Sequence, residues 1–343
     1  MVAVGSGTVN DIVKYASARR TMPYVAVPTA PSMNGYTSSV VAMMSKGLKV
    51  TTPATPPVAV VADMDVLCSA PPTMIQAGLG DIISKWTSNA DWKLAHLVKG
   101  EYFCPLPFAL IQDIEPRYLD SPDGLAAAEA DTVAALTEAL LYSGISMTIA
   151  GTSSPASGAE HLISHTLDMR AHFVGREPKL HGAQVGVATI FVAALYEKLC
   201  QWDPKKADMA DLGGRCLPLE ERAKDISTFF GHLGDSVIQE FEKKHQSWEQ
   251  KRSQLQFISS QWQAILQGVR PYLMPCAQVR QVLAKAGAPT TAAALGVSPD
   301  EFLETVLHAH QIRSRYTVLD LAEDIGLLPD ALEEVARASG VVE

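Results

Sequence analysis

The sequence predicts a small α/β part with parallel strands, followed by a large all-helical part. Residues 1–70 alternate short β-prone runs with glycine, proline and serine, which is typical of α/β units. From about residue 71 onward, apolar residues recur with helical spacing and few segments resemble strands. We therefore expect two domains, at 1–70 and 71–343.

The predicted elements follow this division in chain order. Strands are expected at 2–4, 24–29 and 57–67. Helical periodicity is clearest over five later stretches: 74–97, 123–144, 158–173, 182–199 and 235–269. The longest apolar stretch, Val185 to Tyr196, has about 12 residues, which is too short to span a bilayer.

The amino-acid composition argues against several classes of function. The 343 residues are 47% hydrophobic and 19% charged, as in soluble globular proteins. A net charge of −9 argues against a protein that coats nucleic acid. Five cysteines form no CxxC pair, and the N-terminus lacks the pattern of a signal peptide. We expect a cytoplasmic protein with neither nucleic-acid binding nor membrane insertion.

The first 70 residues are locally basic. No Asp or Glu occurs between Ile12 and Ala62, whereas five cations do: Lys14, Arg19, Arg20, Lys46 and Lys49. A solvated basic surface and a site for an anionic cofactor or substrate explain this equally well.

Two loops of this part suit ligand binding. The segment Gly5 to Asp11 (GSGTVND) follows an expected strand and opens a helix, so its backbone N–H groups are placed for a phosphate. A glycine-rich helix start without a ligand is the alternative, since no acid follows about 20 residues later to hold a ribose. The loop 27–39 is rich in small hydroxyls, which either contact a ligand or stabilise the loop itself.

One set of side chains suits a divalent transition metal. Asp81 lies on an expected helix, His161 and His165 share a helical face, and His181 begins the next helix. One carboxylate and two or three imidazoles are suitable ligands. Histidines packed in a core are the alternative. Four glycines favour the metal, because backbones can crowd there around a small centre: Gly78, Gly80, Gly158 and Gly182.

Taken in order, these stretches resemble a known family. The matching runs are GSGTVNDIVKYAS, VPTAPSMNGYTSS, ADMDVLCSAPPTMIQAGLGDIISKW, SGAEHLISHTLDM, LHGAQVGVATI and RSRYTVLDLAEDIGLL. They are similar to the glycerol-1-phosphate dehydrogenases of the AraM-like branch, relatives of iron-containing alcohol and glycerol dehydrogenases. The resemblance implies a dehydroquinate synthase-like fold, with an incomplete Rossmann-like nucleotide-binding domain and an all-α metal and substrate domain.

The resemblance also implies roles for individual residues. Asp81, His161 and His181 would bind the metal. Asp81, His165 and Asn34 would act on the substrate, although the family usually has aspartate where this chain has Asn34. The cofactor would contact two groups of residues: Gly5, Gly7, Thr8, Val9, Asn10 and Asp11 at the pyrophosphate, and Thr29, Ala30, Pro31, Ser32 and Ser38 at the nicotinamide half.

The implied reaction is the reversible reduction of dihydroxyacetone phosphate to sn-glycerol 1-phosphate. It would use NAD or NADP and one divalent metal (zinc, nickel or iron), in a homodimer that takes a small phosphorylated polyol. Two alternatives stay open: a glycerol or polyol dehydrogenase of the same fold, and a shortened non-catalytic homologue. The glycine-rich loop begins only at Gly5, so we expect that an upstream half of the nucleotide domain is missing and that the first strand lies at an uncovered sheet edge.

Overall fold

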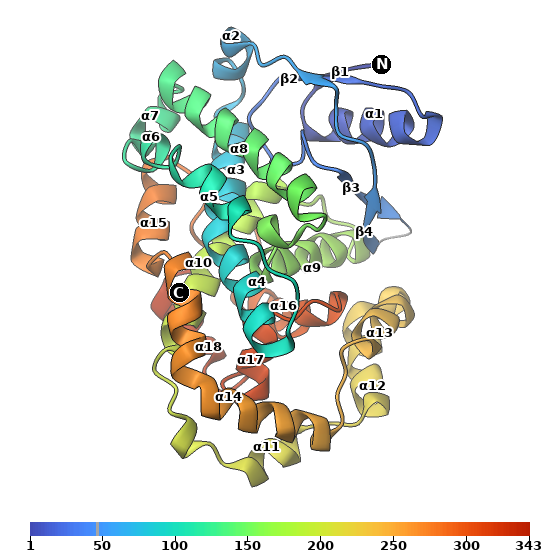
Figure 1. The fold of residues 1–343 in the computed structure, drawn as a ribbon, viewed down its shortest axis with the longest axis vertical. Helices are drawn as coiled ribbons and strands as arrows, with labels where there is room; N and C mark the ends of the chain where they lie inside the picture. Colours follow the sequence, from blue (N-terminus) through green and yellow to red (C-terminus); the bar gives the residue numbers. More distant parts are fainter. Residues whose placement is uncertain (46–47) are drawn as a thin grey trace.

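The computed structural model describes the backbone of residues 1–45 and 48–343, and the side chains outside 44–50. Lys46 and the side chain of Lys49, two of the five cations of the basic stretch, lie outside the described residues. The strand-containing N-terminal part occupies one end of the long axis of the molecule, and helices α11, α12 and α14 occupy the opposite end (Figure 1).

The N-terminal part contains a three-stranded parallel sheet in the order β1-β2-β5, formed by β1 (Val2–Gly5), β2 (Val25–Pro28) and β5 (Ala59–Val60). Inward-facing Ala3, Tyr24 and Ala26 form a small core of their own. β1 lies at the edge, as expected, and its outward residues Val2 and Val4 are 61% and 62% exposed.

The prediction of a third strand at 57–67 is mostly wrong. Only Ala59–Val60 pair as a strand, whereas Met64–Cys68 form helix α2. The helix begins here because the carboxylate of Asp63 accepts hydrogen bonds from the backbone N–H groups of Asp65 and Val66.

A two-stranded antiparallel sheet was not predicted. It consists of β3 (Val40–Ser45) and β4 (Leu48–Pro53), with Val41 opposite Thr52. Both strands contain several β-branched residues, which suit a pleated sheet. The hairpin lies between α1 and the helical part, so it forms one wall of the region where the two parts meet (Figure 1).

The remaining elements are helical, as the periodicity predicts, although the expected stretches 123–144 and 235–269 are each divided into two helices. They are α1 (Gly7–Arg20), α3 (Pro72–Ile83), α4 (Lys85–Lys99), α5 (Leu106–Gln112), α6 (Pro116–Leu119), α7 (Pro122–Ala126), α8 (Ala130–Ala150), α9 (Ala159–Phe173), α10 (His181–Leu199), α11 (Met209–Arg215), α12 (Leu219–Phe230), α13 (Gly234–Glu242), α14 (Trp248–Val269), α15 (Cys276–Lys285), α16 (Pro299–Ala309), α17 (Val318–Asp324) and α18 (Leu332–Ser339). A short 3₁₀ helix, η1 (Ser154–Ala156), precedes α9.

The expected single helix over 74–97 is two helices that meet at Ser84. The Ser84 hydroxyl donates to the carbonyl of Asp81 at 2.7 Å, and the ammonium of Lys85 donates to the same carbonyl at 3.2 Å. Side-chain donors of this kind compete with the helical backbone bond, so the helix is interrupted at Ser84, one turn after Asp81.

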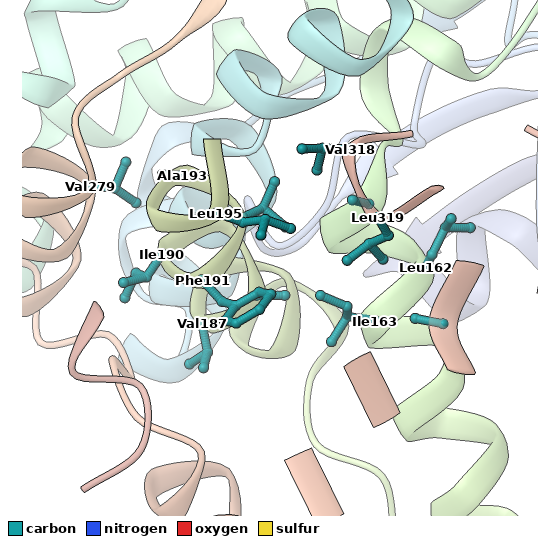
Figure 2. Packing of buried hydrophobic residues seen from close by; sticks show 14 of the residues in the cluster. Leu162, Ile163, Val187, Ile190, Phe191, Ala193, Leu195, Val279, Val318 and Leu319 are labelled. Atoms are coloured by element: carbon teal, nitrogen blue, oxygen red, sulfur yellow. The ribbon is translucent and has the colours of Figure 1, made fainter. Parts of the chain in front are cut away.

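Helix α10 lies at the centre of the helical part. Val187, Ile190, Phe191 and Leu195 are fully buried, and they pack against residues of α9, α15 and α17 (Figure 2). A helix that is apolar on all sides is stable only when other helices surround it, and here they do. Because α10 begins at His181, the packing of its body fixes the position of that histidine.

Helices α3 and α10 cross in backbone contact. A Cβ atom placed on Gly80 would lie 2.1 Å from the carbonyl oxygen of Gly182, and one on Gly182 would lie 1.8 Å from that of Ala77. A Cβ on Gly78 would lie 1.8 Å from the carbonyl of Pro31, in the second N-terminal loop. The predicted crowding of backbones at these glycines is therefore confirmed.

Among the described residues, one helix has the length and composition of a membrane span. α8 has 21 residues with a mean hydropathy of 1.4 over its most apolar window, but 56% of that window is buried inside the protein. Its alanines are interrupted by Thr, Ser and Gly, so it contains no long uninterrupted apolar run. These features are those of a core helix.

Candidate metal centre and active-site cleft

Three side chains from three helices meet at one point. Asp81 comes from α3, His161 from α9 and His181 from the first residue of α10, and one ligand atom of each lies within 4.8 Å of the others. Nε2 of His161 is 3.4 Å from Oδ1 of Asp81. One carboxylate and two imidazoles are a donor set that divalent transition metals accept, so these residues fit a metal.

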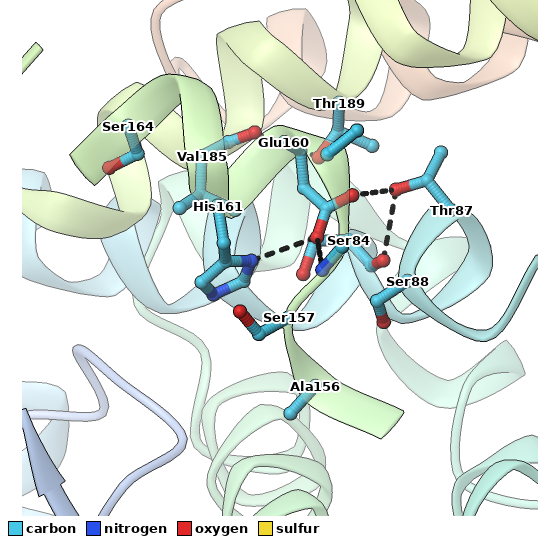
Figure 3. Close-up of polar contacts among 12 residues, drawn as sticks. Ser84, Thr87, Ser88, Ala156, Ser157, Glu160, His161, Ser164, Val185 and Thr189 are labelled. Carbon is cyan, nitrogen blue, oxygen red and sulfur yellow. Dashed lines mark hydrogen bonds and ion pairs between the residues drawn. The ribbon is translucent and has the colours of Figure 1, made fainter. Parts of the chain in front are cut away.

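Glu160 fixes the orientation of the His161 ring. Its Oε1 accepts from Nδ1 of His161 at 2.9 Å and from the backbone N–H of Gly158 at 2.7 Å, while Oε2 accepts from Thr87 at 2.8 Å (Figure 3). Because Nδ1 is bound to Glu160, Nε2 is the nitrogen that faces Asp81. Carboxylates placed behind metal-binding histidines orient the ring and raise its basicity.

Ser164 does the same for His181. The Ser164 hydroxyl donates to Oε1 of Gln184 at 2.8 Å, and its oxygen lies 3.1 Å from Nδ1 of His181. Since the hydroxyl proton is directed to Gln184, the oxygen accepts from Nδ1–H. The imidazole lone pair is then on Nε2, the atom suited to a metal.

The carboxylate of Asp81 is held in its ionised form. Burial by itself would raise the pKa of Asp81, but the hydrogen bond from His161 and the charge of Lys85 outweigh burial and hold the pKa well below its usual range. Burial lowers the pKa of Lys85. An ionised, almost fully buried carboxylate beside two imidazoles is poised to receive a cation.

A cleft of about 600 Å³ connects this centre to the N-terminal part. Gly7, Thr8 and Asp11 of the glycine-rich turn line it together with Asp81, His161, His165 and His181. Ser32, Asn34 and Ser38 of the second loop also line it. The cleft thus brings all three predicted constellations into one space.

Comparison with known proteins agrees with this geometry. The family model of iron-containing alcohol dehydrogenases matches residues 1–71. The chain is 32% identical to a glycerol-1-phosphate dehydrogenase [NAD(P)+] of Bacillus licheniformis, over 99% of this chain and 72% of that protein. It is 33% identical to one from Pyrococcus furiosus, over 99% of this chain and 75% of that protein.

The chain belongs to the glycerol-1-phosphate dehydrogenase family.

Solved structures show the fold of this family. The chain superposes on a probable glycerol dehydrogenase from Sinorhizobium meliloti with a TM-score of 0.60 at 18% identity, over 98% of this chain and 75% of that one. A glycerol dehydrogenase from Schizosaccharomyces pombe gives a TM-score of 0.57 at 18% identity, over 100% and 72%. The expected α/β part followed by an all-α domain, in an iron-containing alcohol dehydrogenase-like fold, is confirmed.

Asn34, which the family resemblance assigns to the substrate, contacts Asp81. Its backbone N–H donates to Oδ2 of Asp81 at 2.7 Å, and its side-chain Nδ2 donates to Oδ1 at 2.9 Å. The amide supplies a donor that an aspartate at this position lacks. The second loop of this family member therefore holds the carboxylate of the candidate metal ligand Asp81 from the N-terminal side.

The predicted cofactor residues divide into two groups. Five line the cleft: Gly7, Thr8, Asp11, Ser32 and Ser38. Six are not among its lining residues: Gly5, Val9, Asn10, Thr29, Ala30 and Pro31. Some of the second group hold the loops in place, since the N–H of Thr29 donates to the carbonyl of Gly5 at 3.2 Å and the carbonyl of Ala30 accepts from Tyr36 at 2.7 Å.

Sequence reasoning missed the residues that support the site. Glu160 adjoins a predicted ligand and Ser164 lies three residues further on, so their helical positions were a usable signal. Lys14 gave no such signal, because its partners lie far along the chain. Its ammonium donates to Ser38 at 3.0 Å and to the carbonyl of Val40 at 3.1 Å, which joins α1 to the second loop.

Proposed function

We propose that the protein catalyses the NAD(P)-dependent, metal-dependent reduction of dihydroxyacetone phosphate to sn-glycerol 1-phosphate, and the reverse reaction. The observation that carries the proposal is the single cleft shared by the glycine-rich turn and the Asp81, His161 and His181 cluster. The relatives that align with almost the whole of this chain are named for this activity.

Asp81, His161 and His181 would hold the metal, which when bound acts as a Lewis acid on the carbonyl oxygen of the substrate. Glu160 and Ser164 keep both imidazoles in the tautomer that presents Nε2 to the centre. Asn34 keeps the carboxylate of Asp81 in place through two hydrogen bonds. Because these supports are built into the fold, the ligands need little rearrangement on binding.

The nucleotide would lie along the N-terminal end of the cleft and supply the hydride. The backbone of Gly7 and Thr8, at the start of α1, offers N–H groups to a pyrophosphate. Ser32 and Ser38 offer hydroxyl groups further along the same wall. In this placement the nicotinamide half of the cofactor would face the histidines.

His165 is the residue we assign to proton transfer at the substrate oxygen. It lies one helical turn after His161, lines the cleft and stacks on His181, with ring centroids 5.6 Å apart. Its imidazole therefore reaches the reacting group without being one of the three clustered ligands. In the direction of reduction it gives a proton to the oxygen at C2, and in oxidation it accepts that proton.

The reaction is tested by following NADH and NADPH absorbance with dihydroxyacetone phosphate, after loading with zinc, nickel or iron. We expect oxidation of the cofactor with this substrate and much less with dihydroxyacetone. Preferred turnover of dihydroxyacetone would identify a polyol dehydrogenase instead. Silence with both substrates, in a folded and metal-loaded chain, would contradict the proposal and favour a non-catalytic homologue.

The assembly and location are part of the proposal. Following the family resemblance, we propose a homodimer that works in the cytoplasm. Sedimentation of the purified chain tests the first statement, since a monomer at micromolar concentration would contradict it.

A further inference from the structure

The cleft has no obvious counter-charge for a phosphorylated substrate. Among its described lining residues there is no lysine or arginine. Lys14, the nearest cation of the glycine-rich helix, is fully buried and donates to the second loop. Arg19 and Arg20 lie at the far end of α1. A phosphate in this cleft therefore needs a cation from outside its lining.

Arg315, in the loop before α17, reaches the cleft wall from behind. Its Nη2 donates to Oγ of Ser153 at 2.8 Å, and its Nη1 donates to the carbonyl oxygen of Ser157. Both serines line the cleft on either side of η1. One guanidinium thus fixes the two ends of a short segment that borders the metal centre.

No carboxylate contacts the guanidinium of Arg315 among the described residues, whereas Arg176 pairs with Glu301 and Arg222 pairs with Glu323. Burial lowers the pKa of Arg315, and the more distant charges of Glu160, Glu101 and Asp91 only partly oppose this shift. A partly buried guanidinium without an anion in contact is costly. An anion bound at the cleft wall would offset that cost.

The hydroxyl of Ser153 is suited to transmit this charge to a ligand, whereas at Ser157 the guanidinium contacts the backbone carbonyl. Because the oxygen of Ser153 accepts from the guanidinium, its own proton is available to donate in another direction. The side chain of Ser157 lies on the side of the His161 ring (Figure 3), so donors for an anion and the metal centre share one wall. A hydroxyl polarised by a cation is a stronger donor.

We propose that Ser153, Ser157 and Arg315 form the subsite for the phosphate group of the substrate, an inference that rests on the proposed function. The two hydroxyls donate to the phosphate oxygens, and the guanidinium supplies the positive charge behind them. This subsite selects a phosphorylated three-carbon ketone over its unphosphorylated counterpart.

Calorimetric titration with inorganic phosphate tests the subsite on the full chain. We expect Arg315→Gln to weaken phosphate binding by about tenfold or more, since a bond to a charged group is lost. The matched control is Arg176→Gln, which removes a guanidinium that pairs with Glu301 and does not line the cleft, and which is expected to leave phosphate affinity unchanged. Equal affinities in wild type and Arg315→Gln, or no phosphate binding by wild type, would overturn the inference.

Steady-state kinetics gives the second readout. In Arg315→Gln, we expect the KM for dihydroxyacetone phosphate to rise about tenfold, with the KM for dihydroxyacetone nearly unchanged. An equal rise for both substrates would mark a structural role and overturn the inference. Should wild type reduce neither substrate, the proposed function fails, while the phosphate titration still decides the subsite.

A second variant covers the case in which Arg315→Gln does not fold. Ser153→Ala leaves the guanidinium in place and removes one donor, so we expect about fivefold weaker phosphate binding with an unchanged thermal midpoint. Phosphate affinity equal to that of wild type in this folded variant would contradict the subsite.

Discussion

His161, His165 and His181 present three imidazoles to one cleft, but their hydrogen bonds separate their roles. Nδ1 of His161 is bound to Glu160, and Nδ1 of His181 is bound to Ser164. Both rings therefore present Nε2 to Asp81. His165 stacks on His181, with an interplanar angle of 22°, and lies outside the cluster of three ligand atoms.

We expect His181→Ala to lose both bound metal and turnover, because a site with three protein ligands does not tolerate the loss of one imidazole. We expect His165→Ala to keep the metal and to lose turnover by about 100-fold, as for a proton donor. Elemental analysis and NADH oxidation, measured on the same samples, distinguish the two. If His165→Ala lost its metal as completely as His181→Ala, His165 would be a metal ligand and the assignment of proton transfer to it would be wrong.

Lys14 makes stability depend on pH. Burial lowers the pKa of its ammonium to about 8, although the charge of Asp11 opposes the shift. In the unfolded chain this lysine keeps its ordinary, higher pKa, so between about pH 8 and pH 10 the unfolded state binds more protons. The cost of burying the charge is present below pH 8 and disappears as the pH rises through this window.

Lys14→Met is expected to remove this dependence. Relative to the variant, the wild-type free energy of unfolding should rise by about 3 kcal/mol between pH 8 and pH 10.5, the window set by the two pKa values. Urea denaturation of both proteins across that range measures it. The variant also loses three hydrogen bonds, so the slope and not the offset is the readout. Parallel slopes would refute the argument.

At the scale of elements, the sequence predicts those helices whose apolar residues recur at regular spacing within one segment. The helical spacing of apolar residues correctly indicates α9 and α10, and it places His161 and His165 on one face. It does not reveal the break at Ser84, which a side-chain hydroxyl produces, or the β3–β4 hairpin, whose pairing depends on the partner strand. The break and the strand pairing depend on contacts that the residue pattern of a single segment does not reveal.

The crossing of α3 and α10 is expected to tolerate no side chain at Gly182. The Cβ atom of Gly182→Ala would lie 1.8 Å from the carbonyl oxygen of Ala77, so the helices must separate. We expect a loss of about 3 kcal/mol in the free energy of unfolding, from overpacking, together with weaker metal binding. The matched control is Gly214→Ala in α11, where a Cβ meets nothing within 4 Å. Equal denaturation midpoints for the two variants would contradict this account.

For the whole molecule, the candidate metal centre joins α3, α9 and α10, three helices of the central core. A ligand that binds only the folded state stabilises it by mass action. Zinc, nickel or iron in about hundredfold excess over its dissociation constant should therefore stabilise the chain by about 2.7 kcal/mol and raise the thermal midpoint by about 5 °C. A chelator should reverse the shift, and His181→Ala should show none. An equal shift in that variant would place the metal elsewhere.

The candidate site was predictable to the extent that its chemistry is visible in residue types. Asp81, His161 and His181 are the ligands that a metal needs, and the structure brings them together. The positions of Glu160 and Ser164 on the helix of His161 were a usable signal for two of their supports, whereas the support from Asn34 was not predictable, because an amide has many uses. Only the fold shows that Asn34 holds a residue 47 positions away.

The backbone contact between α3 and α10 has a consequence for metal selectivity. Asp81 follows Gly80 directly and His181 precedes Gly182, so two of the ligands flank the very atoms that touch. Their main-chain separation is set by this contact, and a side chain at either glycine would push the helices apart at a cost in stability. Redesign for a softer ion is therefore better directed at the donor atoms, for example a thiolate in place of the carboxylate.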